Sequence, residues 1–197
     1  HSAAEYTAIG TATSPGTRMV AVSGHVKRPG VFEIVNGTTT FRDLLYGDEF
    51  CQGIRDDNEL KAFVPGGGSA PWFLPDQLDL PFESKLVGAA GSMLGSGAVM
   101  VMDETTDIPT AAFTLTRFYA HESCGKCVPC RVGTVQMLEA LERLQRGYAR
   151  AADLRRLEEI AGYVQETSFC GLGQAAAVPI LTGLRFFRDE FEARVRH

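Results

Sequence analysis

Long apolar runs are missing from this sequence, and so is an excess of basic residues. No stretch of eighteen consecutive apolar residues occurs, and residues 1–20 lack a charged start followed by an apolar block. We therefore expect neither a membrane span nor a secretory signal, and no direct membrane insertion. The 19 basic and 24 acidic residues give a net charge of −5. A nucleic-acid binder should carry a basic stripe, so that class is not expected.

Familiar catalytic and nucleotide-binding patterns are also missing. No Ser/His/Asp set and no pair of carboxylates stands out. The triple glycine Gly66–Gly68 lacks the G-x-x-x-x-G-K-[ST] pattern of a phosphate loop and is bracketed by Pro65 and Pro71, which favours a tight crossover loop. The small-residue run AGSMLGSG at residues 90–97 has no lysine and no strand–helix context, so we do not expect nucleotide binding there.

What the sequence does contain is a set of cysteines with cluster spacing. Cys124, Cys127 and Cys130 lie in the run ESCGKCVPCRVGT, and Cys170 follows in SFCGLG. Two-residue gaps let one short loop turn three thiolates toward the same place, and a fourth thiolate can complete the ligand set of a [4Fe–4S] cluster. Four cysteines used in this way indicate a reducing compartment rather than a disulfide framework. We expect the fifth, Cys51, to be a small buried apolar residue.

Two other interpretations of these cysteines remain open from spacing alone. Four cysteines also form structural zinc sites, although zinc sites usually pair two C-x2-C units. The segments CGKC and CVPC each fit a dithiol redox pair, but they share Cys127. A second cluster would need a cysteine where Thr134 stands, so the spacing predicts only one.

The residues around the cysteines fit a negatively charged cofactor. We predict that Lys126 and Arg131 lie near the cluster and raise its reduction potential, with solvated surface residues as the alternative. Gly125, Gly171 and Gly173 allow backbone N–H groups to approach sulfur closely. We expect His121 to lie near the site or on the surface rather than to be a ligand.

The order of expected elements predicts an α+β fold. Strands are expected at residues 19–26 and 31–35, a short helix at 41–47, and strands at 61–64 and 98–104, which together form a small domain of β-grasp type. After Pro109 the chain is predicted to be helical, with a second helix from Pro129 to Gly147 and an antiparallel four-helix bundle overall. The expected buried faces are Ala112, Leu115, Phe118 and Tyr119; Val135, Leu138, Leu141 and Leu144; Leu154, Leu157, Ile160, Ala161 and Val164; and Ile180, Leu184, Phe187, Phe191 and Val195. Cys170 is expected at the start of the fourth helix, so that the cluster pins one end of the bundle.

The sequence resembles the C-terminal half of the NADH-binding flavoprotein subunit of respiratory complex I, over essentially all 197 residues. Diaphorase subunits of NAD-linked hydrogenases and formate dehydrogenases look similar. The most specific matching segments are VSGHVKRPGVFE (22–33), VPGGGSAPWFLP (64–75), AAGSMLGSGAVMVMDE (89–104), ESCGKCVPCRVGT (122–134) and SFCGLGQAAAVPI (168–180).

The resemblance implies a domain organisation. Residues 18–104 would form an SLBB (soluble-ligand-binding β-grasp) domain, and residues 105–197 a four-helix domain holding one [4Fe–4S] cluster on Cys124, Cys127, Cys130 and Cys170. Residues 1–17 would be the tail of an N-terminal flavin and NADH domain. That domain's GRGGAGFP-type loop is absent from this sequence, so the chain alone is not expected to oxidise NADH.

The resemblance also implies a role in electron transfer. NADH would deliver a hydride to FMN, and the cluster would take the electrons singly and pass them to the next iron–sulfur subunit. Gly171 and Leu172 would lie near the FMN. The implied partners are the N-terminal FMN/NADH domain of the same subunit, a thioredoxin-like 2Fe-2S subunit and the large iron–sulfur subunit, in a peripheral arm on the cytoplasmic face of the membrane. The alternatives are a diaphorase subunit and, from a different class, a structural zinc scaffold or ligand-binding module.

Overall fold

The computed structural model describes residues 2–196, which fold as two compact units. The first unit ends at Thr106 and the second begins at Asp107, close to the boundary predicted after Glu104. Each unit has its own buried core.

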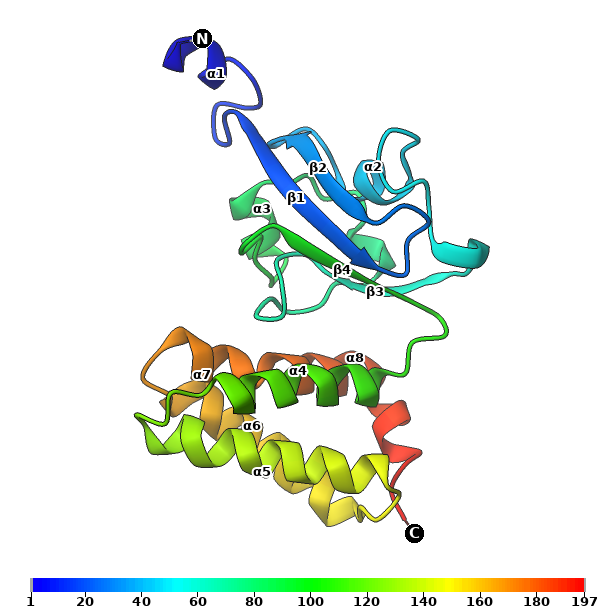
Figure 1. The fold of residues 1–197 in the computed structure, drawn as a ribbon, viewed down its shortest axis with the longest axis vertical. Helices are drawn as coiled ribbons and strands as arrows, with labels where there is room; N and C mark the ends of the chain where they lie inside the picture. The colour runs from blue at the N-terminus through cyan, green and yellow to red at the C-terminus, as the bar shows by residue number, and fades with distance from the viewer. Residues whose placement is uncertain (1, 197) are drawn as a thin grey trace. The chain divides into compact units, whose positions relative to one another are not determined.

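The first unit is built on a four-stranded mixed sheet. Its elements are α1 (Ala3–Thr7), β1 (Thr17–Gly24), β2 (Gly30–Val35), α2 (Phe41–Tyr46), β3 (Leu60–Val64), α3 (Ser84–Ala89) and β4 (Ala98–Asp103), with 3-10 turns at Arg55–Asp57 and Pro75–Gln77. The strand order is β2-β1-β4-β3 (Figure 1). The first and last strands, β1 and β4, are parallel neighbours in the middle, and both outer pairs are antiparallel. This is a β-grasp arrangement, and the α+β prediction is confirmed.

The core of the first unit forms where α2 packs against the sheet. Thr40 caps α2, because its hydroxyl accepts the N–H of Asp43 while the Asp43 carboxylate accepts the N–H of Thr40. The Phe41 ring then lies 5.1 Å from the Phe63 ring and 4.2 Å from the Phe82 ring, measured between centroids. Cys51 is fully buried in this core, as expected, and burial raises the pKa of its thiol to about 11.

The two glycine-rich segments that fitted no nucleotide motif pack against each other. A Cβ on Gly66 would lie 2.2 Å from the carbonyl oxygen of Met93, and a Cβ on Gly95 would lie 2.2 Å from the carbonyl oxygen of Gly66. Only glycine allows two backbones to approach this closely. The glycines of these two segments therefore allow their backbones to pack closely in this unit.

A buried carboxylate, Asp103, lies at the end of β4. Its side chain has no solvent exposure and accepts hydrogen bonds from the Asn58 amide, 3.0 Å away, and the Thr105 hydroxyl, 2.6 Å away. His25 Nδ1 lies 2.7 Å from the same carboxylate, and the Arg55 guanidinium lies 3.4 Å away. Burial acts to raise the pKa of Asp103, but the hydrogen bonds from Thr105, Asn58 and His25 outweigh it and hold the pKa well below its ordinary value.

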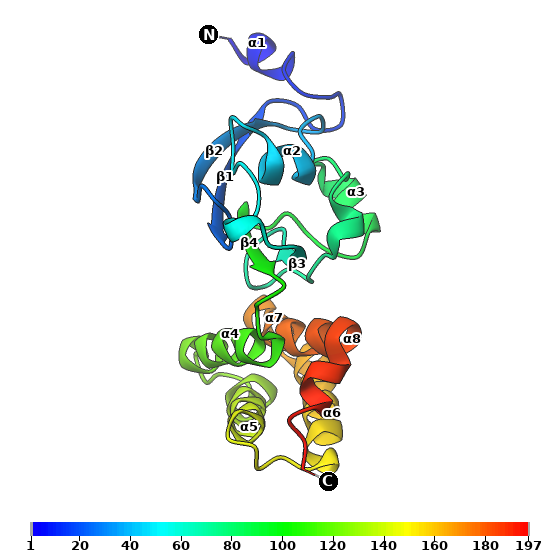
Figure 2. The same cartoon turned by 90° about the vertical axis from the view of Figure 1, so that its right-hand side faces the viewer.

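The second unit is a helical bundle. Its elements are α4 (Ile108–Glu122), α5 (Val128–Gln145), α6 (Ala151–Thr167), α7 (Gly171–Ala176) and α8 (Val178–Glu192). The long helices α4, α5, α6 and α8 form the predicted bundle, in which each packs against two of the others (Figure 2). Within residues 2–196, no helix has both the length and the apolar character needed to cross a membrane.

Three details of the bundle differ from the sequence-based expectation. Cys170 does not begin the fourth long helix, because the short helix α7 intervenes and α8 starts at Val178, with Pro179 in its first turn. Val195 lies beyond the end of α8. Phe118 and Val135, which were expected in the core, are more than two-fifths exposed. On α5 the buried face instead includes two small residues, Gly133 and Thr134, which apolar periodicity does not reveal.

Candidate metal centre

The four cysteines with cluster spacing line a single cavity in the second unit. The cavity has a volume of about 320 Å³, and its lining residues are Ser123, Cys124, Lys126, Cys127, Cys130, Phe169, Cys170 and Leu172. The two stretches of sequence that supply them, 123–130 and 169–172, are brought together at one end of the bundle (Figure 1).

The first wall of the cavity is the connection from α4 to α5. Cys127 is the N-cap residue of α5, and Cys130 lies in the first turn of that helix. Pro129 is the second helical residue, where its missing N–H costs no intrahelical hydrogen bond. The start of an 18-residue helix also carries a partial positive charge, which favours thiolates close to it.

The second wall is the connection from α6 to α7. Ser168 follows the last residue of α6, and Cys170 is the N-cap residue of α7. Gly173, on α7, allows this wall to approach the first. A Cβ on Gly173 would lie 2.4 Å from the Ser168 hydroxyl oxygen and 3.0 Å from Cys130 Cβ. The absence of a side chain at Gly173 therefore sets how closely α7 packs on the start of α5.

The surroundings of the sulfurs favour their charged forms unequally. The pKa of Cys127 is lowered, mainly because the backbone N–H of Phe169 is directed at its sulfur and next because the N–H of Cys130 is. The positive charge of Arg131 makes a smaller contribution in the same direction. Cys127 and Cys130 are buried, whereas Cys124 and Cys170 are exposed. The inner pair is thus shielded from water and the outer pair faces solvent.

Of the four residues that were expected near the cysteines, two line the cavity and two do not. Lys126 lines the cavity. Arg131 is on the surface, and its guanidinium donates a hydrogen bond of 3.0 Å to the carbonyl of Gly125, which ties the cysteine loop to α5. Leu172 lines the cavity, whereas Gly171 is exposed at the start of α7.

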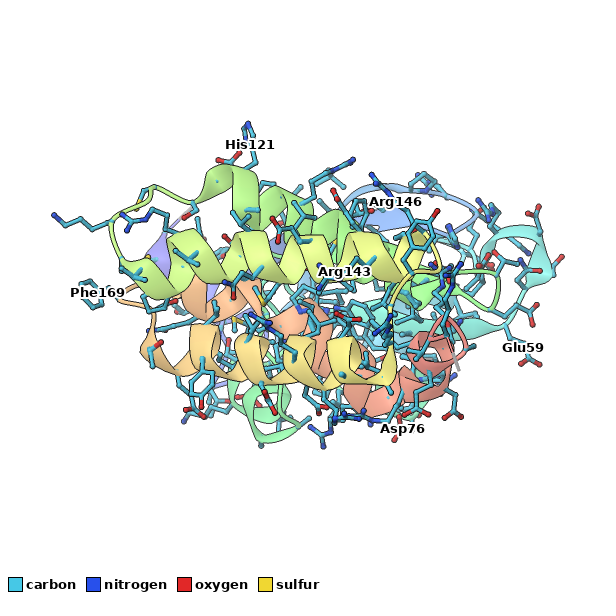
Figure 3. The ribbon with its side chains drawn as sticks, turned by 90° about the horizontal axis from the view of Figure 1, so that it is seen from below. Glu59, Asp76, His121, Arg143, Arg146 and Phe169 are labelled. Carbon is cyan, nitrogen blue, oxygen red and sulfur yellow. The ribbon has the colours of Figure 1, made fainter. Side chains whose placement is uncertain are left out.

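His121 lies outside the cavity lining. Its side chain is exposed, pairs with Glu122 at 2.8 Å and projects from the end of α4 (Figure 3). Of the two expectations for this residue, the surface position is the one observed.

Two residues of the site were not found by sequence reasoning. The Ser123 hydroxyl lies 3.2 Å from the Cys130 sulfur. Phe169 is 80% exposed and points away from the end of the bundle beside the cavity (Figure 3). Each directly precedes a cysteine in the sequence, and that adjacency is the only signal that could have drawn attention to them.

The arrangement of the sulfurs bears on the choice between a cluster and zinc. A tetrahedral zinc site needs four sulfurs at about 2.3 Å from one point. The lining of the cavity includes four cysteines, the donor set that either site requires. In a [4Fe–4S] cluster each cysteine binds a separate iron, and four thiols arranged around a cavity fit that requirement.

Comparison with known families agrees with this geometry. Residues 110–194 match the family described as the NADH-ubiquinone oxidoreductase-F iron-sulfur binding region. This segment belongs to that family. All four cavity cysteines lie within the matched residues, so the region's cofactor is a [4Fe–4S] cluster, and the surrounding cavity of thiols fits it.

The similarity to the F subunit of NADH-quinone oxidoreductase extends over nearly the whole chain. The chain is 43% identical to this F subunit from Streptomyces coelicolor, over 96% of its own length and 41% of the relative's. It is 42% identical to the F subunit of Mycobacterium tuberculosis strain H37Rv, over 96% of this chain and 42% of that one. It is 38% identical to the F subunit of Rickettsia bellii strain OSU 85-389, over 97% of this chain and 46% of the relative's. The chain therefore corresponds to the C-terminal part of the F subunit and spans less than half the length of these relatives.

A solved structure shows the same relationship. The crystal structure of an NAD+-reducing [NiFe]-hydrogenase in the H2-reduced state contains a chain that is similar to 98% of this one. The TM-score is 0.85 and the sequence identity 32%, and the match covers 31% of the hydrogenase chain. The architecture of this chain thus also occurs within a chain of an NAD+-reducing [NiFe]-hydrogenase.

Proposed function

We propose that Cys124, Cys127, Cys130 and Cys170 are the ligands of one [4Fe–4S] cluster, and that the chain is the electron-transfer part of an F subunit. The observation that carries this proposal is that four thiols from two distant segments line one cavity inside the family's iron–sulfur region. When bound, such a cluster supplies one-electron redox chemistry.

In this proposal the chain's own residues position the cluster and tune it. The α4–α5 connection and the first turn of α5 supply three ligands, and the α6–α7 connection supplies the fourth, Cys170, from the opposite wall. The N–H groups of Phe169 and Cys130 stabilise negative charge on Cys127. The positive charge of Lys126, at the cavity, and of Arg131, in the first turns of α5, favours the reduced state for the same reason.

The activity of the whole protein follows as a wider proposal. Electrons would come from NADH by way of FMN held in an N-terminal domain, with Gly171 and Leu172 on the side facing that flavin. They would leave toward the thioredoxin-like 2Fe-2S subunit or the large iron–sulfur subunit, in a peripheral arm on the cytoplasmic face of the membrane. The relatives are subunits of NADH-quinone oxidoreductase, which supports an assembly with other chains. We do not expect the 197-residue chain alone to oxidise NADH.

A second candidate function is supported by the hydrogenase match. A diaphorase subunit would use the same cluster to exchange electrons between NAD and a hydrogenase instead of a quinone-reducing complex. The cysteines and their cavity would do the same work in both, so this alternative changes the partner and leaves the site unchanged.

Metal analysis and cysteine substitution test the ligand assignment. Protein prepared without oxygen should hold roughly four iron and four sulfide per chain and absorb broadly in the visible. The Cys170→Ala variant should lose the intact cluster and its reduced-state paramagnetic signal, because one iron then has no thiolate. Cys51→Ala is the matched control, since Cys51 is buried in the other unit, and it should keep the full iron content. A colourless protein with one zinc, or unchanged iron in Cys170→Ala, would contradict the proposal.

A further inference from the structure

We propose that Ser123 is a positioning residue whose hydroxyl donates a hydrogen bond to the Cys130 sulfur and raises the reduction potential of the cluster. The inference rests on the proposed function, because it requires that Cys130 be a ligand. It assigns a role to a side chain that binds no iron itself.

The distance between the two groups is short for a bond that involves sulfur. The Ser123 oxygen lies 3.2 Å from the Cys130 sulfur. Ser123 follows directly after the last residue of α4, and Cys130 lies in the first turn of α5. The contact therefore joins the end of one helix to the start of the next, and the helices themselves hold the two groups together.

The chemistry of a ligated cysteine fixes the direction of this hydrogen bond. A thiolate that binds iron has no proton to give, so the hydroxyl must be the donor. The backbone N–H of Gly125 lies 3.4 Å from the same hydroxyl oxygen and donates to it. That contact occupies a lone pair of the oxygen and leaves its single proton free to point at the sulfur.

The effect of such a bond depends on the redox state. An added electron increases the negative charge on the thiolates, and a donor directed at a thiolate stabilises the state with more negative charge. Cys130 is only 5% exposed and Ser123 is half-buried, so water has limited access to the sulfur that the hydroxyl contacts. Removal of the hydroxyl should therefore lower the reduction potential of the cluster without removing a ligand.

The test is a redox titration of the cluster-loaded chain, followed by the paramagnetic signal of the reduced cluster. In Ser123→Ala the one-electron reduction constant should fall about three- to tenfold, which places the midpoint potential about 30–60 mV lower. Ser123→Thr keeps the hydroxyl and should restore most of the potential. Iron and sulfide content should equal that of the unsubstituted chain in both variants.

Thr134→Val is the matched control for loss of a hydroxyl close to the same cysteine. The Thr134 hydroxyl is buried and donates to the backbone carbonyl of Cys130 at 2.7 Å, not to its sulfur. This variant should leave the potential unchanged. An unshifted potential in Ser123→Ala, an equal shift in Thr134→Val, or loss of the cluster in Ser123→Ala would each overturn the inference. Absence of a cluster from the unsubstituted chain would instead overturn the proposed function.

Discussion

Asp103 is a single residue on which the folded state of the first unit depends. Its carboxylate has no contact with solvent, and every nearby polar group on His25, Asn58 and Thr105 is placed to stabilise its charged form. The hydrogen bonds hold the pKa of Asp103 below its ordinary value of 3.8. The stabilisation is therefore fully present above about pH 4 and is lost as the pH falls toward the lower pKa of the folded state.

Asp103→Asn should lower the stability of the first unit at pH 7 by about 1–3 kcal/mol, because an amide N–H2 would face groups that already donate. The difference between the two proteins should shrink between about pH 5 and pH 3, since the unfolded chain then binds a proton at Asp103. Urea unfolding followed by the fluorescence of Trp72, the single tryptophan, measures this directly. Asp79→Asn, which removes an exposed partner of Arg42, is the control and should change stability much less. A pH-independent difference would contradict the prediction.

At this scale the sequence indicated the residues that line the cavity only in part: Lys126 and Leu172 were expected there, whereas Ser123 and Phe169 were not. The spacing of Cys124, Cys127 and Cys130 required a shared loop, so their place at one cavity could be foreseen. The contact between Ser123 and Cys130 could not be predicted from the sequence, because it depends on where α4 ends and how α5 starts. The role of Phe169 likewise arises from a backbone N–H, which every residue except proline has.

Among the elements, the α5–α6 pair shows how small residues control helix packing. A Cβ on Gly133 of α5 would lie 2.2 Å from a methyl carbon of Val164, which is itself buried on α6. The two helices therefore meet at a glycine, one turn after Cys130. Their separation affects the first wall of the cavity as well as the bundle core.

Gly133→Ala should destabilise the second unit by about 1–3 kcal/mol through overpacking, more than the gain of up to about 1 kcal/mol from the better helix propensity of alanine. Gly162→Ala is the matched control, since Gly162 is also helical but has nothing within 4 Å of its Cβ position. That control should be neutral or more stable. Thermal unfolding followed by helical circular dichroism distinguishes the two, and equal effects would contradict the packing argument.

The helices were predictable in number but not in every detail. Apolar periodicity located all four long helices, because each buries one face. It failed at Val135, since the true contact face of α5 passes through Gly133 and Thr134, which carry no apolar signal. It also missed α7, whose six residues are too short for a periodic pattern and whose place is fixed by packing through Gly173.

In the whole molecule, the fluorescent tryptophan and the proposed cluster lie in different units, so the state of each unit can be followed separately. Trp72 is buried in the first unit, and the four cysteines that line the cavity are in the second. The change in sequence pattern near residue 104 is where we expected one domain to end. The sequence could not give the strand order β2-β1-β4-β3, because pairing between distant strands is decided by the packed core rather than by local pattern.

Removal of the cluster should therefore affect one unit selectively. A bound group that contacts only folded residues stabilises the unit that holds it. After anaerobic chelation of the iron, the helical transition of the second unit should move to lower temperature, while the Trp72 transition should stay in place. The measurement compares circular dichroism with tryptophan fluorescence on the same samples, and an equal shift of both signals would contradict the prediction.

The unequal exposure of the four cysteines has a further consequence for damage by oxygen. Cys124 and Cys170 face solvent from opposite walls, while Cys127 and Cys130 are enclosed. Oxidants dissolved in water would reach the outer pair of thiols before the inner pair. The outer thiols are thus the part of the proposed site that is most open to attack by oxygen.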